Sequence, residues 1–298
     1  MPPRRKARRP SAAAATSSTS STTTGRSTMP AEALPVALGR LDRLRPLIAI
    51  IPAHNEAPAI GQVVSAARAA RAADGLAFDR IIVVDNASSD GTAALAEAAG
   101  ADTVFEARRG YGAACLAGIA AAGDRGTIVF IDGDASVDLD DLPALLAPML
   151  DKVAGAAELV IGTRPHPDPA AMSLPQRLGN RLATSLIRLL WRVPVHDLGP
   201  FRAIRVDRLQ ALAMRDTAYG WTVEMQIKAF RAGFRVAEVP VAVRARIGHS
   251  KISGTVRGVI GAAIGIFSMI GRLWLADRRD RRAPTPASAV PPARSSLR

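Results

Sequence analysis

The chain has little cysteine: Cys115 is the only one among 298 residues. A single cysteine excludes an internal disulfide and favours a reducing compartment, with the cytoplasm as the default location. The sequence also lacks a glycine-rich phosphate loop. The first predicted strand lies around residues 48–51. Neither a GxGxxG nor a Walker pattern follows it, and Pro52, Asn55 and Glu56 occupy these positions instead. An ordinary dinucleotide-binding or P-loop domain is therefore excluded.

Acidic residues are scarce at both ends of the chain. The formal net charge is +13, but residues 1–30 contribute six basic and no acidic side chains, and residues 272–298 contribute seven basic and two acidic. Residues 31–271 carry 26 basic and 24 acidic side chains, so the central part is close to neutral. A dedicated nucleic-acid-binding fold concentrates positive charge on its folded part, and no specific nucleic-acid partner is expected.

Long apolar runs are also missing. Residues 1–40 are basic and then rich in Ser, Thr and Ala, which predicts a disordered tail and no signal peptide; residues 277–298 are predicted to be a second disordered tail. Residues 255–276 are predicted to form an apolar or amphipathic helix. Its uncharged part, 258–271, would span only about 21 Å and is not expected to cross a bilayer. Two roles stay open: lying in the interface of an anionic leaflet, or packing on the domain.

Between these segments, short β-branched runs alternate with alanine-rich stretches. Strands are predicted around 48–51, 80–85, 102–107, 127–132 and 158–164, with helices between them. This alternation predicts βαβ units and a mainly parallel, nucleotide-binding type of sheet flanked by helices, in one α/β domain over 46–254. Ligands of such sheets bind beyond the carboxyl ends of the strands.

The fourth strand ends in FIDGDAS, residues 130–136. Asp132 and Asp134 are one residue apart at the end of a buried run, where like charges repel, so a cation is expected between them. Mg²⁺ or Mn²⁺ shared with phosphate oxygens fits a site with two carboxylates.

A basic loop follows the last predicted strand. Arg244, Arg246, His249 and Lys251 lie within eight residues, which favours anion binding. Arg177 belongs to a predicted amphipathic helix over 173–192, where a solvated surface role is as compatible with the pattern as a functional one.

Nine short motifs follow one another along about residues 46–256. They are IPAHNE, VVDNASSDGT, RGYGAA, IDGDAS, IGTR, DLGPFR, VEMQIKA, EVPV and GHSKISGT. With these motifs in this order, the chain resembles family 2 glycosyltransferases of the GT-A fold, in the branch of dolichyl-phosphate mannose and glucose synthases and their bacterial polyprenyl-phosphate relatives.

The resemblance implies a donor site for a nucleoside diphosphate sugar. Its nucleotide-binding residues would be Pro52, Glu56, Asp85, Arg109, Gly110 and Asp132. Asp132 and Asp134 match the aspartate pair that binds Mg²⁺ or Mn²⁺ on the diphosphate. A glutamine often stands two residues beyond the second aspartate as a further ligand, and Ser136 stands there in this chain.

The implied reaction is an inverting transfer of a hexose to a polyprenyl phosphate, with peripheral contact to the inner face of the plasma membrane. Asp134, Arg202 and Glu224 are the predicted catalytic residues. The predicted cations for the acceptor phosphate are Arg164, Arg177, Arg244, Arg246 and Lys251. Transfer to a glycan or small hydroxylated acceptor is the alternative and would need a base, Glu224 or Asp197. A more remote alternative is a non-catalytic protein that binds a nucleotide sugar.

Overall fold

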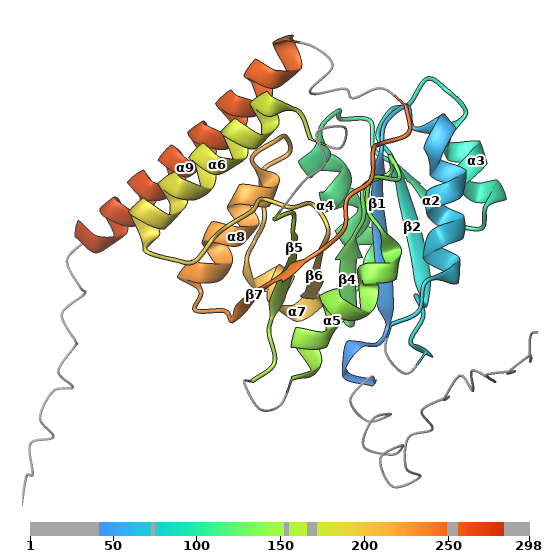
Figure 1. Ribbon diagram of the computed structural model, residues 1–298, viewed down its shortest axis with the longest axis horizontal. Coiled ribbons are helices and arrows are strands. Elements are labelled where there is room, and N and C mark those ends of the chain that lie inside the picture. Colours follow the sequence, from blue (N-terminus) through green and yellow to red (C-terminus); the bar gives the residue numbers. More distant parts are fainter. Residues whose placement is uncertain (1–41, 73–74, 152–154, 166–171, 249–255, 283–298) are drawn as a thin grey trace, which may run out of the picture.

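The computed structural model describes residues 42–72, 75–151, 155–165, 172–248 and 256–282. The predicted tail over 1–40, the predicted tail beyond Arg282, His249 and Lys251 lie outside these residues. Within the described part, seven strands form one sheet in the order β3-β2-β1-β4-β6-β5-β7 (Figure 1). Their bounds are β1 (Leu47–Ala53), β2 (Arg80–Asp85), β3 (Asp102–Phe105), β4 (Thr127–Phe130), β5 (Leu159–Thr163), β6 (Arg202–Arg205) and β7 (Val236–Pro240).

The sheet is mainly parallel, as the sequence predicts. β1 pairs in parallel with β2 and β4, β2 pairs with β3, and β5 pairs with β7. β6 is antiparallel to both β4 and β5, a direction that the strand pattern alone does not reveal. Because β6 is antiparallel to both of its neighbours, β4 and β5 point in the same direction. The carboxyl ends of β1 to β5 therefore share one edge of the sheet, which is called the carboxyl edge.

Helices cover both faces of the sheet (Figure 1). One face packs against α2 (Ala57–Ala69), α3 (Thr92–Ala98) and α5 (Leu142–Leu150). The other packs against α4 (Tyr111–Ala122), α7 (Val206–Ala211) and α8 (Trp221–Arg231). The residues of β1 alternate between the two layers: Ala49 and Ile51 join the first cluster, and Ile48 and Ile50 the second. Burial on both faces explains why these strands are continuously apolar.

Two long helices, α6 (Leu174–Trp191) and α9 (Val256–Arg282), lie side by side at the outside of the molecule (Figure 1). They share a third apolar cluster with α8, which includes Ile187, Ile227, Met269 and Ile270. Ser173 caps α6 through a reciprocal hydrogen-bond pattern with Gln176.

The C-terminal helix corrects two expectations. It continues to Arg282, so residues 277–282, predicted to belong to a disordered tail, are helical. Its stretch Gly258–Asp280 has 23 residues and is long and apolar enough to cross a membrane by length and composition. At 1.5 Å per residue it spans about 35 Å, so the expectation that this segment is too short to cross a bilayer was wrong. The uncharged run 258–271 ends at Arg272, whereas the helix continues through that residue.

A close approach of α4 to the sheet gives a test of the packing. A Cβ added at Gly118 would lie 2.5 Å from Ile50 Cγ2 and 3.1 Å from Val84 Cγ2. Both are stiff β-branched side chains in the core. Gly118→Ala should therefore lower the free energy of unfolding by about 1–3 kcal/mol in chemical denaturation. Gly61→Ala is the matched control, because a Cβ there meets nothing within 4 Å. It should raise the stability by about 0.5–1 kcal/mol, and equal effects of the two variants would contradict the packing.

Candidate active site

The loops after β1 and β2 are tied together at the carboxyl edge. The Asn55 amide donates to Ser88 Oγ at 2.9 Å, and the Glu56 amide donates to Thr92 Oγ1 at the same distance. Ser89 N donates to Asn55 Oδ1 at 2.7 Å. Asn55 has a positive φ of 52°, a sparsely populated conformation for a residue with a side chain. These bonds place Glu56 beside the end of β2, where Asp85 is also buried.

The loop after β3 depends on Asn86, which the sequence analysis did not single out. The Asn86 amide nitrogen donates to the carbonyls of Glu106 and Arg108 at 3.1 and 2.7 Å, and its oxygen accepts from Gly110 N at 2.7 Å. The signal for its role was an asparagine directly after the strand-end aspartate in VVDN.

Arg109 and Gly110 are positioned by this loop. Arg109 is exposed. Gly110 has φ 148°, and a Cβ there would lie 2.1 Å from the Thr217 carbonyl oxygen, so a larger residue would displace the backbone. The structure brings the two predicted nucleotide-binding residues to the same edge as Pro52, Glu56 and Asp85.

Asp132 and Asp134 follow β4 at this edge. Asp134 is 4% exposed, accepts a hydrogen bond from Ser136 N at 3.0 Å and forms an ion pair with Arg246. The Tyr111 hydroxyl donates to Asp132 Oδ1 at 3.3 Å. Burial, followed by repulsion from Asp134, raises the pKa of Asp132 to about 7, although Arg246 and Arg164 oppose this shift. The expected repulsion between the two carboxylates is therefore present, and a guanidinium partly compensates for it.

The basic segment after β7 runs along the same loop. Arg244 N donates to the Ser136 carbonyl and Ile247 N to the Asp134 carbonyl, both at 2.9 Å, and Val243 forms a β-bridge with Val137. The Arg244 side chain pairs with Asp138. The structure thus brings the pair of Asp132 and Asp134 next to the pair of Arg244 and Arg246, and more than 100 residues separate the two pairs in sequence.

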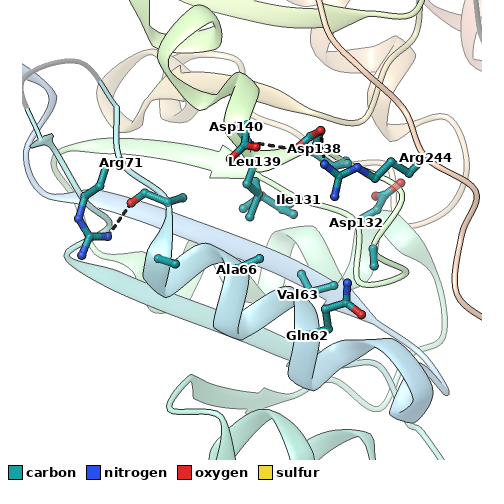
Figure 2. Close-up of a pocket in the computed structure, with 14 residues that line it drawn as sticks. Gln62, Val63, Ala66, Arg71, Ile131, Asp132, Asp138, Leu139, Asp140 and Arg244 are labelled. Carbon is teal, nitrogen blue, oxygen red and sulfur yellow. Dashed lines mark hydrogen bonds and ion pairs between the residues drawn. The ribbon is translucent and has the colours of Figure 1, made fainter. Parts of the chain in front are cut away.

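A cavity of about 490 Å³ opens beside these residues, between α2 and the loop after β4 (Figure 2). Asp132, Asp138 and Arg244 lie on one side of it, and Gln62 and Val63 of α2 lie on the other. The cavity therefore extends from Asp132 along Gln62, Val63 and Ala66 of α2.

The carboxylate pair meets the chemical requirements of a magnesium or manganese site. Within the described residues, no group of three or more His, Cys, Asp and Glu side chains is placed to hold a metal. Mg²⁺ is commonly held by one or two carboxylates together with substrate phosphates, so Asp132 and Asp134 fit a site that a nucleotide completes. Ser136, which stands in place of a third ligand, instead uses its backbone to bind Asp134 and Arg244.

Arg164 lies near this site but is tied to Asp197. Its backbone N and Nε donate to Asp197 Oδ2 at 2.8 Å, and its Nη2 donates to Oδ1 at 2.6 Å. Asp197 is 4% exposed. A bidentate pair of this kind fixes the end of β5 against the loop before β6, and both members already have strong partners. Arg177 lies in the first turn of α6.

Arg202 is fully buried and binds main-chain carbonyls. Its guanidinium donates to Gly199 O and to Thr222 O, the latter at 3.1 Å. Burial lowers its pKa to about 10, so it stays charged at neutral pH. Its contacts join the loop before β6 to the start of α8. The catalytic role predicted for Arg202 stays a prediction, because these contacts describe a structural one.

Glu224 is 3% exposed and supports the segment before α8. Its carboxylate accepts hydrogen bonds from Arg215 N at 3.1 Å and Asp216 N at 2.8 Å, and it pairs with Lys228 Nζ at 2.7 Å. The catalytic role predicted for Glu224 stays a prediction, because these contacts favour a structural role.

The fold and this edge can be compared with known proteins. Residues 48–211 match the family described as Glycosyl transferase family 2. The chain belongs to this family. An uncharacterized glycosyltransferase of Mycobacterium tuberculosis is 36% identical over 222 residues, which cover 74% of this chain and 96% of that protein.

Two family 2 relatives carry more specific names. The polyprenol monophosphomannose synthase of Mycolicibacterium smegmatis is 33% identical, over 70% of this chain and 81% of its own length. The undecaprenyl-phosphate mannosyltransferase of Micrococcus luteus is 30% identical, over 73% and 90%. Among solved structures, glucosyl-3-phosphoglycerate synthase from Mycobacterium tuberculosis, in complex with Mn²⁺, UDP and glucosyl-3-phosphoglycerate, has a TM-score of 0.60 at 24% identity, over 78% of this chain and 82% of its own. This likeness confirms the GT-A fold.

The raised pKa of Asp132 predicts how metal binding depends on pH. A metal binds the ionised carboxylate, so the proton held below about pH 7 must be displaced. Mn²⁺ affinity, measured by electron paramagnetic resonance, should be about tenfold weaker at pH 6 than at pH 8. Asp140→Asn, at an exposed neighbouring carboxylate, should keep this dependence. A flat profile in the unsubstituted protein would contradict the role of Asp132.

The contacts of Glu224 predict the outcome of its substitution. Glu224→Gln weakens an ion pair and buried hydrogen bonds, and should lower the free energy of unfolding by about 1–3 kcal/mol. Lys228→Gln breaks the same pair from the other side and is the matched control. Both variants should have a lower melting temperature. At temperatures below it, both should keep the transferase turnover of the unsubstituted protein. Loss of turnover in Glu224→Gln alone, without loss of stability, would show a catalytic base instead.

Proposed function

We propose that this family 2 glycosyltransferase moves a hexose from a nucleoside diphosphate sugar to a polyprenyl phosphate, with Mg²⁺ or Mn²⁺ at Asp132 and Asp134. The proposal rests on one observation: a group of carboxylates and a group of arginines lie next to each other at one edge of the sheet. The carboxylate pair after β4 lies directly against the basic segment of Arg244 and Arg246. The carboxylate pair suits a metal-bound diphosphate, and the basic segment suits an anionic acceptor.

The donor lies, in this proposal, over the ends of β1 to β4. Pro52, Glu56 and Asp85 form the floor for the nucleoside, and Arg109 and Gly110 form its side. A divalent metal, when bound, neutralises negative charge on the diphosphate leaving group. Asp132 and Asp134 would hold it, and Asn86 keeps the loop of Gly110 in place.

The acceptor requires cations rather than a base. A polyprenyl phosphate is already ionised at neutral pH and can attack the anomeric carbon directly, from the face opposite the leaving group, which inverts the configuration. Arg246 can exchange its carboxylate partner for a phosphate without leaving the site, because its backbone neighbour Ile247 is anchored to Asp134 O. Arg244, Arg164, Arg177 and Lys251 are the further cations that we propose for the acceptor.

Names of relatives support the lipid acceptor over a soluble one. Two relatives with 30% identity or more are named for mannosyl transfer to a polyprenyl carrier. A hydroxyl acceptor would need a carboxylate base. The two candidates, Glu224 and Asp197, are both buried. Glu224 already binds backbone amides, and Asp197 already binds Arg164. These contacts disfavour a hydroxyl acceptor.

The proposal predicts a lipid-linked product. The purified chain, incubated with Mn²⁺ or Mg²⁺, a polyprenyl phosphate and labelled GDP-mannose, UDP-glucose, UDP-GlcNAc or UDP-galactose, should transfer label from one donor into the organic phase. Asp134→Asn should reduce this label to background while keeping the melting transition, because it removes a metal ligand at nearly constant volume. Asp140→Asn is the matched control and should retain transfer.

Two results would overturn the proposal. Undiminished transfer by Asp134→Asn would contradict the metal site. Metal-dependent hydrolysis or binding of a donor, with no label in lipid, would contradict the lipid acceptor and support a soluble acceptor instead.

A further inference from the structure

Exposed large apolar side chains are concentrated on two helices. Nine such side chains are at least 44% exposed among the described residues, and seven of them belong to α6 and α9. They are Leu174, Leu178, Leu182 and Leu189 of α6, and Ile260, Ile264 and Leu275 of α9. Singly exposed apolar residues are ordinary, but a concentration of this kind marks an interaction surface.

The four leucines of α6 form a single stripe. With 100° of rotation per residue, they fall within an arc of about 80°. The buried residue Ile187 lies about 175° from the centre of that arc, so the stripe faces directly away from the core. A helix that only packed on the domain would leave polar residues on this side.

The apolar residues of α9 repeat the arrangement. Ile260, Ile264 and Leu275 fall within an arc of about 60°, and the buried Met269 lies about 150° from its centre. Both stripes thus lie opposite the cluster that the two helices share. Together they are called the leucine face.

The two helices form one unit on the domain. They run side by side in the same direction (Figure 1). Near their ends, Trp191 Nε1 donates to Asp277 Oδ2 at 2.6 Å, and Arg231 of α8 pairs with the other oxygen of Asp277 at 2.7 Å. Asp277 is 9% exposed. If α9 crossed a membrane alone, these contacts and the packing of Met269 and Ile270 would be lost.

Positive charge accompanies the leucine face. The sequence of α6 contains no acidic residue. The two acids of α9, Asp277 and Asp280, both contact Arg231. The exposed arginines on the two helices and at the end of α6 are Arg181, Arg188, Arg192, Arg272, Arg278 and Arg279.

We propose that the leucine face docks onto an anionic lipid bilayer, with α6 and α9 lying in the membrane plane as a packed pair. An apolar stripe flanked by arginines matches the acyl boundary and the negative headgroups of such a surface. A second copy of the chain fits less well, because a two-fold interface would bring arginines of both copies together.

Vesicle flotation tests the proposal independently of the reaction. The full chain is floated with vesicles of phosphatidylglycerol and phosphatidylcholine, or of phosphatidylcholine alone, without nucleotide sugar or polyprenyl phosphate. The unsubstituted protein should bind the anionic vesicles. Leu178→Gln/Leu182→Gln/Leu189→Gln should lower this binding at least tenfold.

Leu95→Gln/Phe105→Gln is the matched control, because both residues are exposed apolar side chains on α3 and β3, away from the leucine face. It should bind as the unsubstituted protein does. Arg181→Gln/Arg188→Gln should weaken binding to anionic vesicles only. Equal binding by the triple variant would overturn the proposal and assign the binding to other basic segments of the chain.

Two further measurements cover the remaining outcomes. If light scattering shows that the triple variant converts a dimer into a monomer while vesicle binding is unchanged, the face is a contact between copies. Tryptophan quenching by brominated lipids needs no variant: bromines near the headgroups should quench more strongly than bromines at the bilayer centre. Stronger quenching from the centre would show that α9 spans the membrane.

Discussion

Repulsion between the carboxylates of Asp132 and Asp134 is the constraint around which the carboxyl edge is organised. The two side chains follow a fully buried strand, and burial keeps one of them from ionising freely near neutral pH. The structure compensates with Arg246, whose segment is fastened to the same loop by backbone hydrogen bonds. A site that holds two like charges in this way is suited to exchange its cation, because either a guanidinium or a metal satisfies the same electrostatic need.

Other buried charges support the backbone around this pair. Arg202 joins the loop before β6 to α8, Glu224 holds the segment that leads into α8, and the pair of Arg164 and Asp197 fixes the end of β5. Each charge is compensated by several hydrogen bonds, which is the condition for burying it. Removing one partner would leave the other uncompensated, so substitutions at these residues are expected to lower the stability of the fold.

The two proposed surfaces are compatible with one another. A polyprenyl phosphate resides in a membrane, so an enzyme that uses it must bring its phosphate site to the lipid headgroups. Arg177 lies in the first turn of α6, whose four exposed leucines belong to the leucine face. The helix thus connects a proposed acceptor cation with a proposed lipid contact, and docking of the face would limit the distance over which the phosphate must be drawn from the bilayer.

The sequence by itself determined the parallel αβ pattern, the edge at which polar residues gather and the pair of Asp132 and Asp134. Local periodicity and strand-end composition carry that information, because they depend on neighbours a few residues away. Tertiary structure alone decided the direction of β6, the bridging role of Asn86 and the partners of Arg202 and Glu224. It also decided how far α9 extends and that its apolar stripe, like that of α6, lies opposite the apolar cluster that the two helices share. These features depend on contacts between segments distant in sequence, and a charged residue inside a motif looks the same in the sequence whether its partner is a substrate or a backbone carbonyl.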